Sequence, residues 1–371
     1  MHSTNMISSG LPALAGITVL DLSTRLPGPL ATLMLAQAGA RVIKIERPPG
    51  EEFRDYHPRV DGMSAHYAWL NRGKECLTLD FRSDEGRQRF EALLSKADIL
   101  IEQFRPGVMD RLGLGYKDLS ARHPRLIYCA ITGYGRNDDR SKEAAHDLNY
   151  QASAGLVGSA PRDARGVPAL PSVLLGDIAG GTYPAVMSIL MAVLQRNHSG
   201  RGQFLDIAMA RNIEVFSFWA TILGHITGQW PTPGAGRHTG GSPRYNVYAA
   251  RDGRLLAVGA LEDRFWQNFL EGIGLSLPAG FEQADPQGVI ELVAQKIATE
   301  DADFWIKRLE GRDTCCNLAP GLAETQASSH AAGTLAAAAD GKAMPWPAIS
   351  LPVAPQFTCN DAAPPVYLAG K

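Results

Sequence analysis

The sequence predicts an α/β protein with a large Rossmann-like domain on a mostly parallel sheet and a smaller α+β domain after it. The first half alternates short apolar runs with helical patterns, which is typical of a parallel sheet covered by helices on both faces. After about residue 200 the pattern changes to two apolar runs joined by a turn, followed by helices. With 371 residues, of which 45% are hydrophobic, the chain has enough material for two cores.

Apolar periodicity and turn residues place the elements of the first half. Buried strands are predicted at residues 17–22, 41–46, 76–81, 97–104 and 125–135. Helices are predicted at residues 30–40, 83–96 and 116–122 and around residues 204–222. A further helix, long and apolar, is predicted directly after Asp177. Loops that follow the strands of such a sheet usually bind its ligand, so the chemistry is expected there.

The second half predicts a smaller unit. The Asp252-Gly253 dipeptide between two apolar runs predicts a β-hairpin. The Pro- and Gly-rich stretch before it fits a linker or an active-site loop. Helical patterns follow at residues 262–272, 288–298 and around 302–309. The predicted domains are residues 1–210 (large domain), 211–241 (linker and active-site loop), 242–330 (small domain) and 331–371 (return segment onto the large domain).

The composition narrows the partners and the location. A formal net charge of −2 argues against nucleic acid and membranes as partners. The five cysteines show no metal-ligand spacing, and no metal site is expected. The amino-terminal residues lack a signal-peptide pattern, and no stretch is expected to span a membrane. We therefore expect a cytoplasmic protein.

Common catalytic motifs are missing from the chain. It has no GxGxxG after the first strand, no GxxxxGK[ST], no HExxH and no GxSxG, which argues against a simple dehydrogenase, P-loop enzyme, zinc protease or hydrolase. Basic residues instead follow the predicted strands, where a phosphate-bearing ligand is bound well, although each one alone is more often a solvated surface charge. These residues are Arg25, Arg47, Arg72, Lys74, Arg105 and Arg111.

His146, Asp147 and Asp177 are the candidate chemical groups. A histidine and a carboxylate that the fold brings together can move a proton at neutral pH. Taken alone, a His-Asp dipeptide is more often a polar loop pair. Asp177, taken alone, is more often a helix N-cap worth about 1 kcal/mol.

Several blocks in order resemble the family III CoA-transferases (the CaiB/BaiF superfamily), which include the α-methylacyl-CoA racemases. The blocks are VLDLSTRLPGPLATLMLAQAGARVIKIERP, NRGKECLTLDFRSDEGR, ADILIEQFRPGVMDRLGLGY, RLIYCAITGYG, HSGRGQFLDIAMAR and GGSPRYNVYAARDGRLLAVGALEDRFW. Successive blocks in one order are more specific than any single motif. The resemblance implies an acyl-CoA thioester substrate, with coenzyme A bound as part of that substrate and no permanent cofactor.

The resemblance implies catalytic roles by position. Asp177 falls on the acid used throughout the family, which CoA-transferases employ as a nucleophile that forms an aspartyl-CoA anhydride. His146 followed by Asp147 resembles the racemases, because transferases commonly have a non-basic residue before this acid. Glu262 matches an acid that lies beside the catalytic histidine in racemases, and the Gly-Gly-Ser-Pro sequence at 240–243 is closer to the racemase loop. The resemblance also implies that five residues contact coenzyme A: Arg47, Leu79, Phe104, Arg105 and Arg111. We add Arg25, which is one of the basic residues after the predicted strands.

We therefore expect a racemase that inverts the α-carbon of a 2-methylacyl-CoA, with a CoA-transferase as the alternative and a non-catalytic acyl-CoA binding protein as a third possibility. The α-proton of a thioester becomes removable when the enolate oxygen is stabilised, for which we expect a backbone N–H near Asp177. His146 and Asp177 on opposite faces would allow removal on one side and delivery on the other. The resemblance further implies an interlocked homodimer in which the small domain of one chain closes over the active site of the other.

Overall fold

A computed structural model of the chain describes residues 12–327, 351–353, 357 and 365–368. The described residues form two compact units. The first contains the described residues up to 154, residues 172–215 and the described residues from 351 onward. The second contains residues 155–171 and 216–327, so an excursion from the first half of the chain belongs to it.

This excursion differs from the predicted large domain, which was continuous over residues 1–210. The backbone N–H of Gly234 donates to the carbonyl of Ser159 at 3.1 Å. The α-carbon of Pro161 lies so close to Gly234 that a side chain at that glycine would be only 2.9 Å from it. Local sequence gave no signal for this long-range contact.

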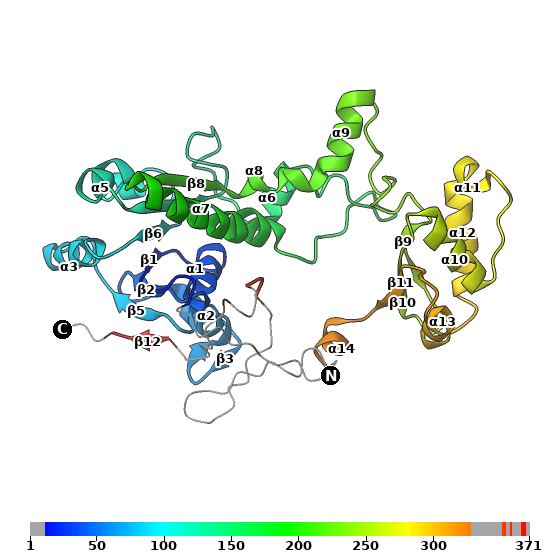
Figure 1. Cartoon of the computed structure of the whole chain (residues 1–371), viewed down its shortest axis with the longest axis horizontal. Helices are drawn as coiled ribbons and strands as arrows, with labels where there is room; N and C mark the ends of the chain where they lie inside the picture. Colours follow the sequence, from blue (N-terminus) through cyan, green and yellow to red (C-terminus); the bar gives the residue numbers. More distant parts are fainter. Residues whose placement is uncertain (1–11, 328–350, 354–356, 358–364, 369–371) are drawn as a thin grey trace. The chain divides into compact units, whose positions relative to one another are not determined.

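The first unit is built on a seven-stranded sheet in which all strand pairs are parallel (Figure 1). The order is β12-β5-β2-β1-β6-β7-β8, so the chain moves outward from β1 in one direction and then from β6 in the other. The expected Rossmann-like α/β fold is confirmed, with its topological switch point between β1 and β6. The strands are β1 (Thr18–Leu22), β2 (Arg41–Glu46), β5 (Glu75–Thr78), β6 (Ile99–Glu102), β7 (Ile127–Thr132), β8 (Phe204–Ala208) and β12 (Val366–Tyr367).

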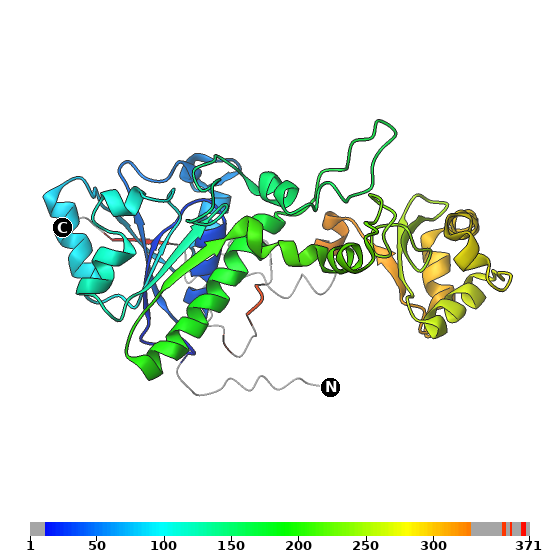
Figure 2. The same ribbon diagram turned by 90° about the horizontal axis from the view of Figure 1, so that it is seen from above.

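Helices cover both faces of this sheet (Figure 2). Side chains of α3 and α5 pack into the main core with Leu20, Ile43 and Leu100 of the central strands. The opposite face carries α1, whose residues 27–36 are all buried, and α7. The helices are α1 (Pro27–Gln37), α2 (Ala65–Asn71), α3 (Asp84–Leu94), α4 (Val108–Arg111), α5 (Tyr116–Arg122), α6 (Asp147–Ser153), the π-helix η2 (Gly176–Thr182), α7 (Tyr183–Ser199) and α8 (Met209–Asn212). A short 3-10 turn, η1 (Glu52–Asp55), and a small hairpin of β3 (Arg59–Val60) and β4 (Met63–Ser64) follow β2.

The predicted helix at 204–222 was wrong in its first part. Residues 204–208 form β8, which pairs in parallel with β7 from Tyr128 opposite Phe204 to Thr132 opposite Ala208. The helical signal in fact begins at Met209, in α8. The strand was missed because its pairing partner lies more than seventy residues earlier in the chain.

The expectation that no stretch approaches a membrane span was also wrong by length and composition. Together η2 and α7 form a continuous helix of 24 residues, Gly176–Ser199, with a mean hydropathy of 1.4 in its most apolar window. This helix packs on α1, β7 and β8, and it buries Ile189 as well as the charged Arg196. Arg196 forms an ion pair with Asp98 at 3.0 Å. Through these contacts the helix packs on the sheet of the first unit.

The second unit contains the predicted hairpin and helices. β9 and β10 pair antiparallel, with Gly253 at a φ of 80° in the turn between them. Three helices pack on this sheet around Trp266, Phe269 and Trp305. The elements are α9 (Phe218–Thr227), β9 (Tyr245–Ala249), β10 (Leu255–Gly259), α10 (Asp263–Ile273), α11 (Phe281–Ala284), α12 (Pro286–Ile297), α13 (Ala302–Leu309), β11 (Cys316–Ala319) and α14 (Leu322–Ala327); a 3-10 turn, η3 (Glu214–Ser217), precedes α9.

The predicted return segment lies mostly outside the described residues. Its described strand, β12, pairs in parallel with β5, with Val366 opposite Glu75. This pairing places the strand at the edge of the large sheet (Figure 1).

Candidate active site

The carboxyl ends of β5, β2, β1 and β6 lie side by side, because these strands are parallel neighbours. The loops after them therefore share one edge of the sheet. Five of the residues expected to bind coenzyme A lie in these loops: Arg25 after β1, Arg47 after β2, Leu79 after β5, and Phe104 and Arg105 after β6. The sixth, Arg111, is the last residue of α4, the short helix that follows the β6 loop.

Three of these arginines are free to bind an anion. Arg47, Arg105 and Arg111 are exposed, and their guanidinium groups have no hydrogen bond or ion pair within the described part of the chain. Arg25 is engaged, because its guanidinium donates to the Tyr56 hydroxyl at 3.0 Å and lies 3.9 Å from a carboxylate oxygen of Glu52. The free guanidinium groups suit phosphates, which accept two parallel hydrogen bonds from an arginine.

Lys74 does not belong to the ligand-binding cluster, contrary to expectation. It is 1% exposed, and its ammonium lies 3.2 Å from the Asp21 carboxylate and 2.7 Å from the Thr32 hydroxyl. Arg72 is also committed locally, because its guanidinium stacks over the Trp69 ring at 4.2 Å. Lys74 instead neutralises a buried aspartate in the central strand.

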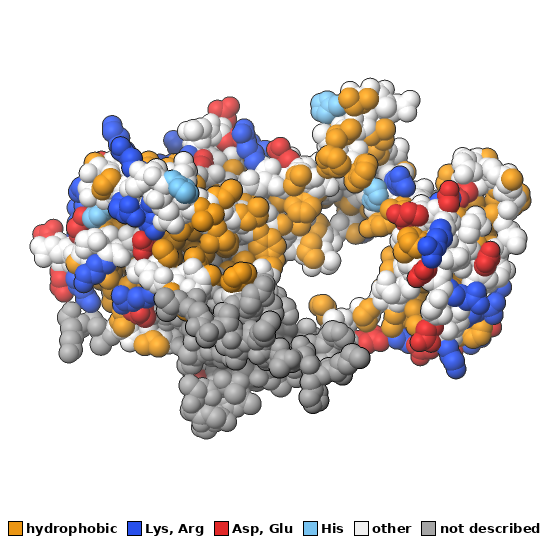
Figure 3. Space-filling view, viewed as in Figure 1, with side chains coloured by type: hydrophobic (Ala, Val, Ile, Leu, Met, Phe, Trp, Pro, Cys, Tyr) orange, Lys and Arg blue, Asp and Glu red, His pale blue; other side chains and the backbone are white. Residues whose placement is uncertain are grey.

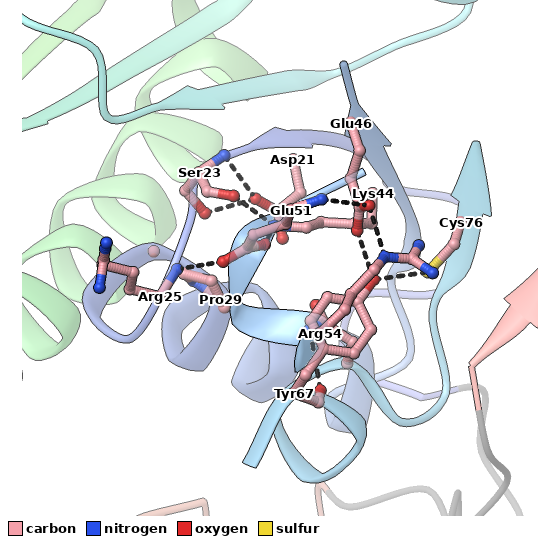
Figure 4. Close-up of polar contacts among 12 residues, drawn as sticks. Asp21, Ser23, Arg25, Pro29, Lys44, Glu46, Glu51, Arg54, Tyr67 and Cys76 are labelled. Atoms are coloured by element: carbon pink, nitrogen blue, oxygen red, sulfur yellow. Dashed lines mark hydrogen bonds and ion pairs between the residues drawn. The ribbon is translucent and has the colours of Figure 1, made fainter. Parts of the chain in front are cut away.

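A buried charge network supports the loop after β1 (Figure 4). The Lys44 ammonium lies 3.0 Å from one oxygen of Glu51, and the other oxygen accepts the backbone N–H of Arg25 at 2.6 Å. Burial by itself would raise the pKa of Asp21, but the charges of Lys74 and Lys44 outweigh it and lower that pKa to about 2. The loop that presents Arg25 is thus held by the carboxylate of Glu51, which is paired with the buried Lys44.

The β6 loop is fixed at the switch point by two residues that the sequence analysis did not single out. The buried Glu102 carboxylate accepts the backbone N–H of Phe104 at 2.7 Å, and burial raises the pKa of Glu102 to about 7. The Gln103 side chain accepts the N–H of Gly28 at 3.3 Å. Position 28 requires glycine here, because a β-carbon would lie 2.1 Å from that of Ser23.

Leu79 and Phe104 differ in their availability. The Leu79 side chain is 3% exposed and belongs to the main core, so it has little surface to offer a ligand. Phe104 is half-buried and packs on the edge of the same core. Of the two, Phe104 has the ring surface that an adenine needs.

Asp147 joins the start of α6 to the start of η2. Its carboxylate is 7% exposed and accepts the backbone N–H of Asp177 at 2.9 Å and the Gln151 amide at 2.5 Å. Gly176 leaves room for this contact, because a β-carbon there would lie 3.1 Å from the Asp147 oxygen. His146, exposed at the N-cap of α6, therefore directly precedes the residue that holds Asp177.

Asp177 is the second residue of the π-helix and not an N-cap. π-Helices are rare and occur frequently at functional sites. The carboxylate is half-buried and has no hydrogen bond or ion pair among the residues described. Burial and the nearby Asp147 charge raise the pKa of Asp177 to about 6. Its own N–H is already donated to Asp147, so this amide is not the enolate-stabilising donor that we expected near it.

The predicted Glu262 lies in the second unit, exposed at the N-cap of α10. Arg244 supports this end of the helix, since it donates to Asp263 at 2.6 Å and to Glu282 at 2.5 Å. Ser242 and Arg244 line a pocket of about 430 Å³ beside the Gly-Gly-Ser-Pro loop. The pairing of Glu262 with His146 stays a prediction.

Comparison with known proteins identifies the family of this chain. A model of CoA-transferase family III matches residues 14–366. The chain belongs to CoA-transferase family III. It is 33% identical over 309 residues to the alpha-methylacyl-CoA racemase of Homo sapiens, covering 82% of this chain and 76% of that protein. It is 31% identical over 318 residues to the succinyl-CoA:mesaconate CoA-transferase of Haloarcula hispanica, covering 81% and 78%.

A solved structure from the same family agrees with the fold. The crystal structure of a CAIB/BAIF family protein from Brucella suis matches with a TM-score of 0.74 at 27% identity, covering 85% of this chain and 86% of that one. The chain is therefore an enzyme of the family III CoA-transferase and racemase type. Racemases and transferases match it at similar identity, so the residues at the site must distinguish the two reactions.

We predict that Asp147→Asn lowers the pKa of Asp177 from about 6 toward its ordinary value of 3.8. Asparagine keeps an oxygen for the Asp177 N–H but removes the neighbouring negative charge. Carbon-13 NMR of the carboxyl groups across pH 3–8 measures the midpoint, with the distant exposed Asp118→Asn in α5 as the control. An unchanged Asp177 midpoint in Asp147→Asn would show that the two carboxylates do not interact.

Proposed function

We propose that this family III enzyme is a racemase that inverts the α-carbon of a 2-methylacyl-CoA. The observation that carries the proposal is the hydrogen bond from the Asp177 N–H to Asp147, which ties the residue after His146 to a carboxyl with a pKa of about 6. A group that accepts and returns a proton near neutral pH works best with a pKa close to the working pH.

The proposed reaction uses His146 and Asp177 on opposite faces of the α-carbon. One group removes the α-proton, which leaves an enolate of the thioester, and the other delivers a proton to the opposite face. In the reverse direction the two groups exchange roles, so one must be protonated when the other is not. Asp177 fits this requirement because its carboxyl is neutral below about pH 6 and charged above it.

The coenzyme A part of the substrate is proposed to bind along the strand-end loops. Exposed Arg47, Arg105 and Arg111 supply free guanidinium groups for its phosphates. Phe104 offers a half-buried ring for the adenine. Since coenzyme A enters with each substrate, no permanent cofactor is proposed.

The alternative is a CoA-transferase that uses Asp177 as a nucleophile and passes through an aspartyl-CoA anhydride. The freedom of the Asp177 carboxylate from hydrogen bonds among the described residues favours a nucleophile as much as a base. His146 favours the racemase, because transfer through an anhydride requires no second proton carrier.

A homodimer in the cytoplasm completes the proposal. Tyr183, Met187, Leu190 and Leu194 form an exposed apolar stripe along α7, at the spacing of one helix face (Figure 3). Met187 is 59% and Leu194 63% exposed. Soluble monomers rarely expose such a contiguous stripe, and a second copy of the chain is the proposed cover.

Heavy water tests the reaction. Wild-type protein should exchange the α-hydrogen of a 2-methylacyl-CoA with solvent and interconvert its epimers, as mass spectrometry and chiral chromatography can measure. His146→Ala and Asp177→Ala should each abolish interconversion, while each retains exchange from the one epimer that the remaining base serves. His198→Ala, which changes an exposed histidine in the last turn of α7, is the control and should keep both activities.

A transferase would behave differently in the same assay. Asp177→Ala would remove all activity, whereas His146→Ala would keep transfer to a carboxylate acceptor. A hydroxylamine-sensitive adduct that forms on Asp177 only with acyl-CoA would overturn the racemase proposal.

The CoA-binding residues are tested without catalysis. Arg105→Ala and Arg111→Ala should each weaken binding of free coenzyme A by about tenfold to a hundredfold, because a charge-assisted phosphate contact contributes about 1.5–3 kcal/mol. Lys96→Ala, an exposed cation at the opposite edge of the sheet before β6, should bind as the wild type does. Isothermal titration calorimetry measures the affinities; unchanged binding in both arginine variants would contradict the assignment.

The dimer is tested by light scattering with size-exclusion chromatography. At micromolar concentration we expect twice the chain mass of 39.9 kDa. Met187→Glu and Leu194→Glu should shift the protein toward the monomer, because a charge on the stripe cannot be buried without a partner. A monomeric wild type would remove this part of the proposal.

A further inference from the structure

The segment between β7 and α6 carries a set of contacts with no role in the proposed chemistry. It runs from Gly133 to His146 and contains no helix or strand. Arg140 lies near its middle. The Arg140 guanidinium carbon is 3.6 Å from the centre of the Tyr134 ring, and the guanidinium donates to the Ser153 hydroxyl at 2.6 Å.

These two contacts join the start of the loop, at Tyr134, to the last residue of α6, Ser153. Tyr134 is the second residue after β7 and is 7% exposed, so its ring is buried in the first unit next to the sheet. Ser153 is the last residue of α6, the helix that begins directly after His146. An arginine that stacks on a ring and donates from its edge to a hydroxyl uses both properties that distinguish it from lysine.

Further contacts hold the loop to this arginine and lead to His146. The Arg140 backbone N–H donates to Asp138 at 2.9 Å, and its side chain lies 3.5 Å from Glu143. The Tyr150 ring meets the Tyr134 ring edge-on at 5.5 Å, and the Tyr150 hydroxyl donates to the carbonyl of Ala145 at 3.1 Å. The residue before His146 is therefore fixed from α6.

We propose that Arg140 is a positioning residue for His146. It joins Tyr134 at the end of β7 to Ser153 in α6, which holds the loop and the helix that present His146 in one arrangement. The residue after His146 is Asp147, whose carboxylate accepts the backbone N–H of Asp177. The two links together therefore define where the histidine stands relative to the aspartate. We call this link from Tyr134 through Arg140 to Ser153 the clamp. The effect of the clamp on catalysis rests on the proposed function, whereas the clamp itself does not.

The clamp is tested first without substrate. Arg140→Gln should speed amide hydrogen exchange in residues 136–148 at least tenfold, measured by mass spectrometry on the full-length protein. Lys142→Gln is the matched control, because it also removes one positive charge and lies only two residues from Arg140. The Lys142 side chain has no hydrogen bond or ion pair among the residues described. Equal exchange in the two variants would overturn the proposal, whatever reaction the enzyme catalyses.

The consequence for catalysis is tested by proton exchange in heavy water. Arg140→Gln should lower kcat by about tenfold to a hundredfold with KM unchanged, because a small displacement of a catalytic group has effects of that size. The loss should fall mainly on the epimer that His146 serves. Arg140→Lys, which keeps the charge but loses the planar fork, should recover part of the rate, and Ser153→Ala should show a milder loss of the same kind.

Two outcomes separate the possible failures. A raised KM for acyl-CoA with unchanged kcat in Arg140→Gln would mean that this arginine binds the substrate phosphates, which overturns its role in positioning. Faster amide exchange in Arg140→Gln, in a protein whose wild type neither exchanges nor inverts the α-carbon, would support the clamp and reject the proposed racemase.

Discussion

The parallel pairing of β1 with both β2 and β6 is the constraint on which the first unit depends. Leu20 lies opposite Ile43 on one side and Leu100 on the other, so β1 is buried at the centre of the sheet. Because all these strands run the same way, their following loops share one edge. This geometry alone brings Arg47 and Arg105 to one surface although they are far apart in the chain.

Buried charges then fix the loops at that edge. Asp21 in β1 has no exposed surface, and an uncompensated charge at such a site would cost several kcal/mol. Lys74 and Lys44 compensate it, and Lys44 also meets Glu51 beneath the loop after β1. Lys74 is bound within this network, whereas Arg47 and Arg105 have no hydrogen bond or ion pair from their side chains among the described residues. The fold thus uses its buried lysines for support and leaves these arginines available for a ligand.

The candidate active site depends on a second balance, between the carboxylates of Asp147 and Asp177. Asp147 is buried and receives two hydrogen bonds, one of them from the backbone of Asp177. The Asp177 carboxylate receives none among the described residues, and burial together with the Asp147 charge raises its pKa to about 6. Two aspartates of the same chemistry therefore have different roles, which the environment of each decides. The π-helix holds Asp177 in this half-buried position, at the start of the long helix that continues into α7.

The sequence by itself determined the two-part α/β organisation, the hairpin at Asp252-Gly253 and the order of strand-end cations, because apolar periodicity and turn chemistry are local properties. Successive sequence blocks also identified the family. Only the tertiary structure decided that Lys74 is buried, that residues 204–208 form a strand, and that Asp147 holds Asp177. These outcomes depend on which distant residue is packed opposite, since burial and pairing set the cost of a charge and the partner of a backbone group.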